Sequence, residues 1–115
     1  MIQRFDTGPR MSKIVIHNGV AYLSGQVPQD ASADIAGQAQ QVLHAIDELL
    51  QRAATDKTHI LRADIFLADM ADFAAMNDIW EAWVPQDAAP ARATVQARLA
   101  RPELKIEIVV VAAIP

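Results

Sequence analysis

Residues 104–113 read LKIEIVVVAA, and this stretch decides the fold. Apolar side chains occupy every second position over Leu104–Val110, which predicts a β-strand with one face packed on helices. The alternate positions change from polar at Glu107 to apolar at Val111. We therefore expect the second face of this strand to need an apolar cover at one end only.

The segments before this strand predict a hairpin and a helix. Short apolar runs at Lys13–Ile16 and Val20–Leu23 flank Asn18-Gly19, a pair that readily takes the positive φ values of a type I′ turn. Apolar residues then recur with the spacing of one helical face over 35–53, which predicts the first helix.

A further strand and helix are expected in the middle of the chain. Residues 61–68 alternate, with Leu61 on the inward face, and Asp69 is placed to cap a helix whose inward stripe runs over Phe73–Trp83. Alternation over Ala93–Leu99 predicts another strand before the last one.

This order of strands and helices predicts an α+β fold, with both helices on one face of a single sheet, in one domain spanning residues 1–115. No third helix is left to cover Val109 and Val111, and monomers rarely expose large apolar patches. We expect another copy of the chain to cover them, in a cyclic homo-oligomer with its sheets turned inward. The alternative is a harmless cluster of β-branched residues on a strand that twists out of contact.

Composition excludes several classes of function. The formal net charge of −4 repels phosphate backbones, so no nucleic acid partner is expected. The absence of cysteine removes disulfides and thiolate chemistry. Residues 1–10 contain no apolar signal segment and no apolar run is long enough to cross a bilayer, so we expect no membrane association and a cytoplasmic location. The histidines lack metal-ligand spacing, and no nucleotide-binding glycine motif is present, so no metal or organic cofactor is implied.

Three polar residues are candidates for chemistry. Arg92 opens a strand, where its guanidinium could grip a carboxylate through two parallel hydrogen bonds, although the spacing alone favours a solvated arginine. Glu107 interrupts an apolar strand, where a half-buried carboxylate could take a proton from water and return it to a leaving group. The pattern equally permits an exposed Glu107 paired with Lys105 or Arg98. Asn77 borders the second helical stripe, where a structural hydrogen bond is expected.

The segments Pro90–Val95, Leu99 and Ile106–Ile108, in this order and spacing, resemble the signature of the RidA/YjgF family of reactive-intermediate deaminases. The resemblance extends through Phe73–Asn77, Ser24–Pro28 and Gly8-Pro9, and so covers almost the whole chain. It implies a chorismate-mutase-like α+β fold with one mixed sheet. It also implies a homotrimer with helices outside, sheets inside and ligand sites between subunits.

The same resemblance implies a hydrolase for enamines and imines such as 2-aminoacrylate and 2-iminopropanoate, without cofactor, giving a 2-keto acid and ammonia. Carried over by motif, Arg92 would bind the substrate carboxylate, and Glu107 would position and deprotonate the attacking water. Ser24, Gly25 and Asn77 would line or support the pocket.

Two residues depart from the family archetype. Thr94 stands where the archetype has cysteine, but its backbone N–H is preserved for a ligand contact. Arg10 stands where the archetype has tyrosine after Gly-Pro, which would alter the pocket and the preferred acid side chain. Both residues are expected among the substrate contacts, in a side branch of the family.

Two other functions are weighed against hydrolysis. A non-catalytic, small-carboxylate-binding or chaperone-like trimer would need Arg92 alone, and RNA processing is disfavoured by the acidic balance. Hydrolysis makes a geometric demand, because Arg92 and Glu107 would be several residues out of register in a tight hairpin. They must meet through non-adjacent strands or across a subunit boundary.

Overall fold

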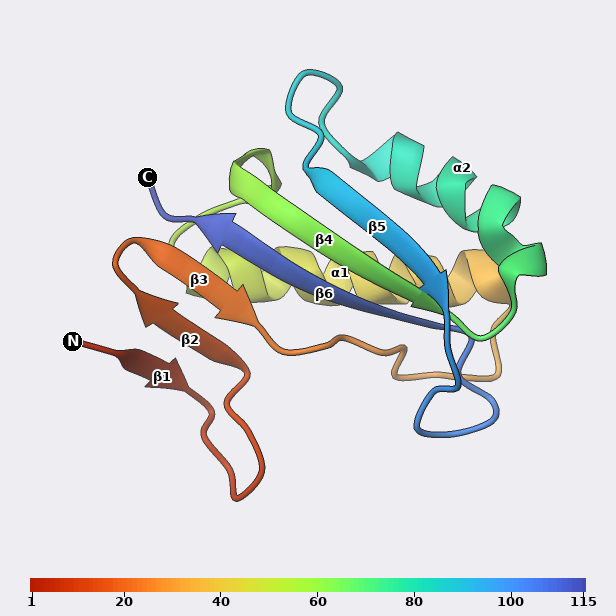
Figure 1. Ribbon diagram of the computed structural model, residues 1–115, viewed down its shortest axis with the longest axis horizontal. Helices are drawn as coiled ribbons and strands as arrows, with labels where there is room; N and C mark the ends of the chain where they lie inside the picture. The colour runs from red at the N-terminus through yellow and green to blue at the C-terminus, as the bar shows by residue number, and fades with distance from the viewer.

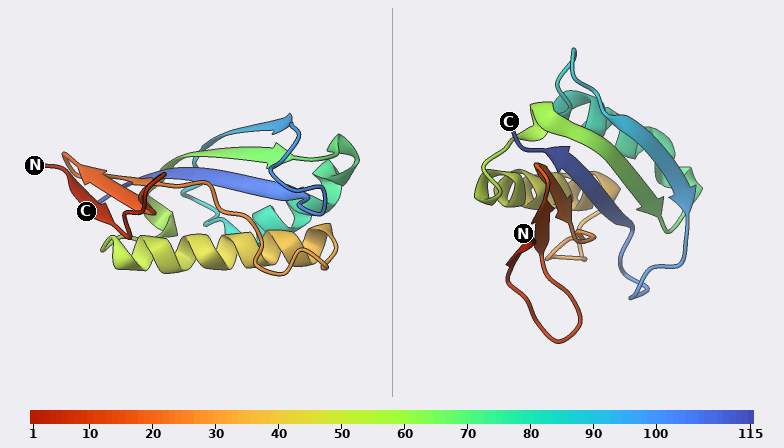
Figure 2. Two further views of the ribbon diagram at one scale, coloured as in Figure 1. Left: turned by 90° about the horizontal axis from the view of Figure 1, so that it is seen from below. Right: turned by 60° about the vertical axis from the view of Figure 1, so that its left-hand side comes forward.

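A six-stranded mixed sheet carries both helices on one face in the computed structural model, which describes residues 1–115 (Figures 1 and 2). Its strands and helices are β1 (Gln3–Phe5), β2 (Ile14–His17), β3 (Val20–Leu23), α1 (Ile35–Arg52), β4 (Ile60–Leu67), α2 (Phe73–Trp83), β5 (Ala91–Gln96) and β6 (Ile106–Ala113). The strand order is β1-β2-β3-β6-β4-β5, in which β4 and β5 are parallel and all other neighbours antiparallel. The predicted α+β architecture is confirmed.

The predicted hairpin and first helix are present. Asn18 and Gly19 have φ values of 51° and 73°, as a type I′ turn requires, and join β2 to β3. The Asp34 side chain caps α1 by accepting a hydrogen bond from the Gly37 N–H. Neither helix combines the length and apolar character needed to cross a membrane.

Three local predictions are wrong, and one strand was missed. Strand β1 was not predicted, because three residues carry no periodicity; it is held by pairing with β2. A register shift between Ile60 and Arg62 turns Leu61 outward, so Ile60 takes the buried position. Asp69 caps a 3-10 turn that precedes α2, not α2 itself. The fifth strand spans Ala91–Gln96, two residues earlier than predicted, and the chain leaves the sheet before Leu99.

The two faces of β6 separate the core from an open surface. Leu104 and the inward residues Ile106, Ile108 and Val110 are buried under the helices, as predicted. The opposite face of the sheet has no helix over it (Figure 2). Large apolar side chains on or beside that face are about half exposed: Tyr22 at 48%, Leu61 at 50% and Val95 at 47%. The chain itself therefore leaves these apolar side chains of the sheet uncovered.

Gln38 ties α1 to two loops. Its side chain is fully buried, and its Nε2 donates to the carbonyl oxygens of Ala31, Ala33 and Glu103, each at 3.1 Å. Its Oε1 accepts from the Lys105 N–H at 2.8 Å. This one amide fixes the start of β6, two residues before Glu107, relative to the helix layer.

Candidate active site

Arg92 lies on β5, the edge strand of the sheet, and its side chain points to the helix face. The register pairs Arg92 with the buried Ala63 of β4, which places both side chains on the same side of the sheet. Its guanidinium carbon lies 5.9 Å from the ring centre of Phe73 and 5.5 Å from that of Trp80, both on α2. Arg92 is half-buried and takes part in none of the five ion pairs of the chain. Its donors are therefore free to bind an external anion.

The free edge of β5 adds backbone donors beside this guanidinium. Ala97 donates its N–H to the Leu67 carbonyl, and alternation along the strand turns the N–H groups of Arg92 and Thr94 away from β4. A carboxylate at this edge can thus meet the Thr94 N–H as well as the Arg92 side chain.

Two side-chain oxygens between the sheet and α2 lack hydrogen-bond partners. Asn77 Oδ1 and Thr94 Oγ1 are buried and unpaired. Asn77 follows Phe73 by one helical turn and precedes Trp80 by three residues, so it belongs to the helix face that meets Arg92. The hydrogen bond to the sheet predicted for Asn77 is not formed by its side-chain oxygen, which stays available to a donor.

Glu107 lies on the open face of the sheet, against a glycine. A Cβ on Gly25 would stand 2.0 Å from Glu107 Oε2, so the carboxylate occupies the space that any other residue type would fill. Gln26 and Ile108 exchange backbone hydrogen bonds of 2.9 and 3.1 Å, which fixes the Gly25 segment beside β6. Glu107 is half-buried and pairs with neither Lys105 nor Arg98.

The remaining predicted contacts are Ser24, which directly precedes Gly25, and Arg10. Ser24 donates its N–H to the Lys13 carbonyl at 2.9 Å, and its carbonyl accepts from Gln26 Nε2 at 3.0 Å. Arg10 is exposed on the loop between β1 and β2, which returns to the sheet at Lys13, beside Ser24. Arg10 forms no ion pair within the chain.

Arg92 and Glu107 do not meet within one chain. Glu107 pairs with Phe66 of β4, and Phe66 pairs with Val95 of β5. Arg92 lies three residues before Val95 on β5. Two strand spacings and three residues separate their Cα atoms by about 14 Å, and the side chains point to opposite faces. The route through non-adjacent strands is thereby excluded, and only a subunit boundary can bring the two groups together.

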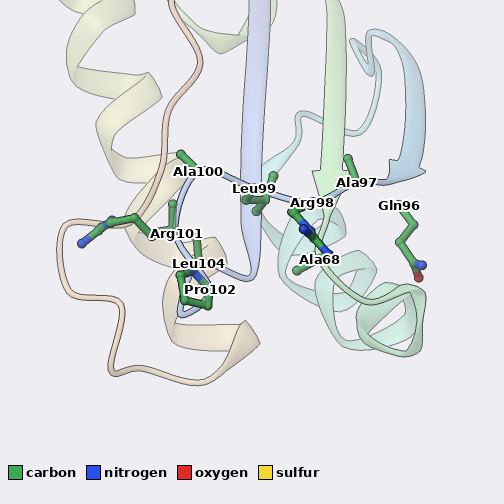
Figure 3. Close-up of a pocket in the computed structure, with 9 residues that line it drawn as sticks. All are labelled: Ala68, Gln96, Ala97, Arg98, Leu99, Ala100, Arg101, Pro102 and Leu104. Carbon is green, nitrogen blue, oxygen red and sulfur yellow. The ribbon is translucent and has the colours of Figure 1, made fainter.

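Three hollows on the surface of the chain are lined by other residues. One of about 700 Å³ lies where β4 and β5 end, under the loop that leads to β6, with Arg98 beside the strand ends and Arg101 extending away from it (Figure 3). Two others, of about 530 and 350 Å³, lie against α1. No group of three or more His, Cys, Asp or Glu side chains is arranged to hold a metal.

The groups with shifted pKa values also lie outside the candidate site. Hydrogen bonds from Arg52, Ser32 and Thr58 lower the pKa of one aspartate each: Asp6, Asp30 and Asp56, respectively. His59 also bonds to Asp56, and His44 pairs with Glu48. These exposed contacts organise turns and helix surface, and none of them faces Arg92 or Glu107.

Sequence reasoning missed the aromatic contacts of Arg92. The sequence pattern predicted Phe73 and Trp80 only as members of the inward apolar stripe of α2, whereas both rings lie beside the Arg92 guanidinium. The spacing of seven residues between Phe73 and Trp80 puts both rings on one helix face, but only the packing of α2 against β5 shows that an arginine lies there.

Comparison with known proteins finds relatives that match this chain over almost its whole length. The family described as Endoribonuclease L-PSP matches residues 1–114. A RutC family protein of Haemophilus ducreyi is 51% identical over 99% of this chain and 97% of its own length. The RutC family protein YoaB of Escherichia coli is 48% identical over 98% of each chain. The crystal structure of a YjgF family member from Neisseria meningitidis is 46% identical, with a TM-score of 0.97 over 100% of this chain and 96% of that one.

Proposed function

The chain belongs to the Endoribonuclease L-PSP family, together with YjgF and RutC proteins, and on this premise we propose that it hydrolyses small 2-imino and 2-enamino acids to 2-keto acids and ammonia. The proposal rests on one observation. Arg92 and Glu107 are half-buried, oppositely charged and unpaired inside the chain, and they belong to different faces of its sheet.

Each group forms one half of a site. Arg92 and the Thr94 N–H supply donors for a carboxylate at the β5 edge, and Asn77 Oδ1 supplies an unpaired acceptor next to them. Glu107 and the Gly25 segment supply a base and a close backbone surface. Because both halves cannot act on one small acid within a chain, the site forms where β5 of one subunit meets the open sheet face of another.

The open face supplies the reason for assembly. Its exposed apolar side chains, Tyr22, Leu61 and Val95, would be covered by a second copy of the chain. A homotrimer with helices outside and sheets inside buries this face and creates equivalent clefts between subunits. The helix surfaces remain in contact with solvent.

In the proposed reaction, Arg92 holds the substrate carboxylate and so places C2 near Glu107 of the neighbouring subunit. A water molecule bonds to C2 through its oxygen, while the π electron pair of the C=N bond moves to nitrogen and Glu107 accepts the water proton. Glu107 returns this proton to nitrogen, which gives a carbinolamine with a hydroxyl and an amino group on C2. Glu107 then carries the hydroxyl proton to the amino nitrogen as the C–N bond breaks with its electron pair on nitrogen, so that ammonia leaves and an oxygen lone pair forms the carbonyl. An enamine reaches the imine first by taking a proton at its methylene carbon while its nitrogen loses one.

Subunit mixing tests this arrangement. Arg92→Ala and Glu107→Gln should each lower kcat/KM for 2-iminopropanoate by about 10²-fold or more. When the two inactive variants are unfolded and refolded together in equal amounts, about a quarter of the sites combine an intact Arg92 with an intact Glu107 from a neighbour. Activity should return to about that fraction of wild type. No recovery from a mixed oligomer would refute a shared site.

A non-catalytic carboxylate-binding trimer is the second outcome. The unpaired donors at Arg92 would support binding without any contribution from Glu107. Binding of 2-oxopropanoate by wild type and by Glu107→Gln, with no imine hydrolysis in either, would favour that function over the proposed one.

A further inference from the structure

We propose that Phe73 and Trp80 are positioning residues that hold the Arg92 guanidinium ready for a ligand carboxylate. This inference rests on the proposed function, because it assigns a role to residues that act through Arg92. It is carried by the two ring contacts, at 5.9 and 5.5 Å, and by the absence of any acidic partner for Arg92 in the chain.

The chemistry of the contact suits an anion-binding arginine. A guanidinium held over ring faces is attracted by the ring quadrupoles, and this attraction uses none of its five N–H donors. An aspartate or glutamate in the same place would occupy two donors and neutralise the charge. Aromatic contacts therefore restrict the side chain while leaving its whole charge and its hydrogen-bonding capacity for the ligand.

Other arginines of this chain are held differently. Arg52 makes a two-pronged contact with Asp6 at 2.9 and 3.0 Å, Arg62 pairs with Asp64, and Arg101 pairs with Glu103. Arg52 also lies over the ring of Phe5, 5.6 Å from its centre, but its charge is already paired. Unlike these three arginines, Arg92 contacts two aromatic rings and has no acidic partner in the chain.

The two rings differ in how firmly they are fixed. Trp80 is 6% exposed and belongs to the core, so its ring is held by core packing. Phe73 is 39% exposed at the start of α2 and forms the outer contact. A substitution at Phe73 can therefore remove one ring face without opening a cavity in the core.

Phe73→Leu tests the inference, with Phe73→Tyr as the variant that keeps a ring. The ligands are 2-oxopropanoate and its primary amide, titrated against the assembled protein by NMR. Loss of one cation–π contact should weaken 2-oxopropanoate binding about two- to fivefold, leave binding of the amide unchanged and raise KM for 2-iminopropanoate with little change in kcat. Phe73→Tyr should restore the wild-type values.

Phe5→Leu is the matched control, because it removes an arginine–phenylalanine contact of similar length on the opposite edge of the sheet. It should leave both ligands unaffected. Equal weakening of acid and amide in Phe73→Leu would show structural damage and overturn the inference, as would unchanged binding of the acid. If wild type itself does not prefer the acid to the amide, the carboxylate-binding role of Arg92 is wrong and the proposed function fails with it.

Discussion

Replacement of Gly25 by alanine perturbs the proposed base without touching the base itself. The added Cβ would lie 2.0 Å from Glu107 Oε2, 3.0 Å from Cδ and 3.3 Å from Cγ, whereas ordinary contact begins at 3.4 Å. The carboxylate must therefore recede by about 1.4 Å. A displacement of roughly 1 Å at a reacting group can lower the rate about 10²-fold, so we expect kcat/KM to fall by at least that factor.

The fold should tolerate this substitution. Gly25 does not have a positive φ, so alanine meets no backbone strain, and the nearest clashing atom is the end of a flexible side chain. We expect the free energy of unfolding to change by less than about 1 kcal/mol. The substitution should therefore lower activity without lowering stability, because the Glu107 carboxylate moves while the sheet keeps its structure.

The assay generates 2-iminopropanoate in place with an amino-acid oxidase and traps the remaining imine with semicarbazide, so that hydrolysis lowers the semicarbazone yield. Gly8→Ala is the control, because a Cβ there meets only a carbonyl oxygen at 3.9 Å and Gly8 also lacks a positive φ. If Gly25→Ala keeps activity within about threefold of wild type, or if Gly8→Ala loses as much, the position of the Glu107 carboxylate does not control the reaction.

Three other predictions concern stability and partners. Gln38→Leu should lower the free energy of unfolding by about 2–4 kcal/mol in chemical denaturation, because three carbonyl oxygens and one N–H lose their buried partner. The hydrogen bond from Arg52 holds the pKa of Asp6 below its ordinary value of 3.8. The contact therefore stabilises β1 above pH 3.8 and is lost as the pH falls through the lowered pKa of Asp6. Asp6→Asn should speed amide exchange in β1 at neutral pH and have no effect at a pH low enough to protonate Asp6. The net charge of −4 predicts that fluorescence anisotropy will detect no binding of single-stranded RNA at moderate salt, and binding that survives added salt would contradict this electrostatic reasoning.

The parts of the fold that depend on local pattern could be predicted from the sequence. The Asn18-Gly19 turn needs only two residues that accept positive φ, and the alternation of β6 fixes which of its side chains enter the core. The single apolar stripe of α1 likewise requires that only one of its faces meets the sheet. Each of these features follows from spacing within one segment.

The features that escaped prediction depend on contacts between segments. The bulge beside Leu61 shifts the buried face by one residue, which alternation alone does not show. The apolar Val95 faces the open side of the sheet, whereas Arg92 and Thr94 face the helices. For the same reason the contact of Glu107 with Gly25 has no local signal beyond a glycine two residues after a strand segment.

Charge pairing gives a reason why the proposed site would be divided between subunits. The chain pairs Arg52, Arg62 and Arg101 with acids of its own, and all three pairs are substantially exposed, where each contributes little to stability. The two half-buried charges of the candidate site have no such partner, although removing charge from water is more costly there. Across the proposed interface each would find the other's charge at the distance of one small acid, with water or ligand between them. The assembly that covers the apolar side chains of the sheet would then also orient the two groups of the proposed reaction.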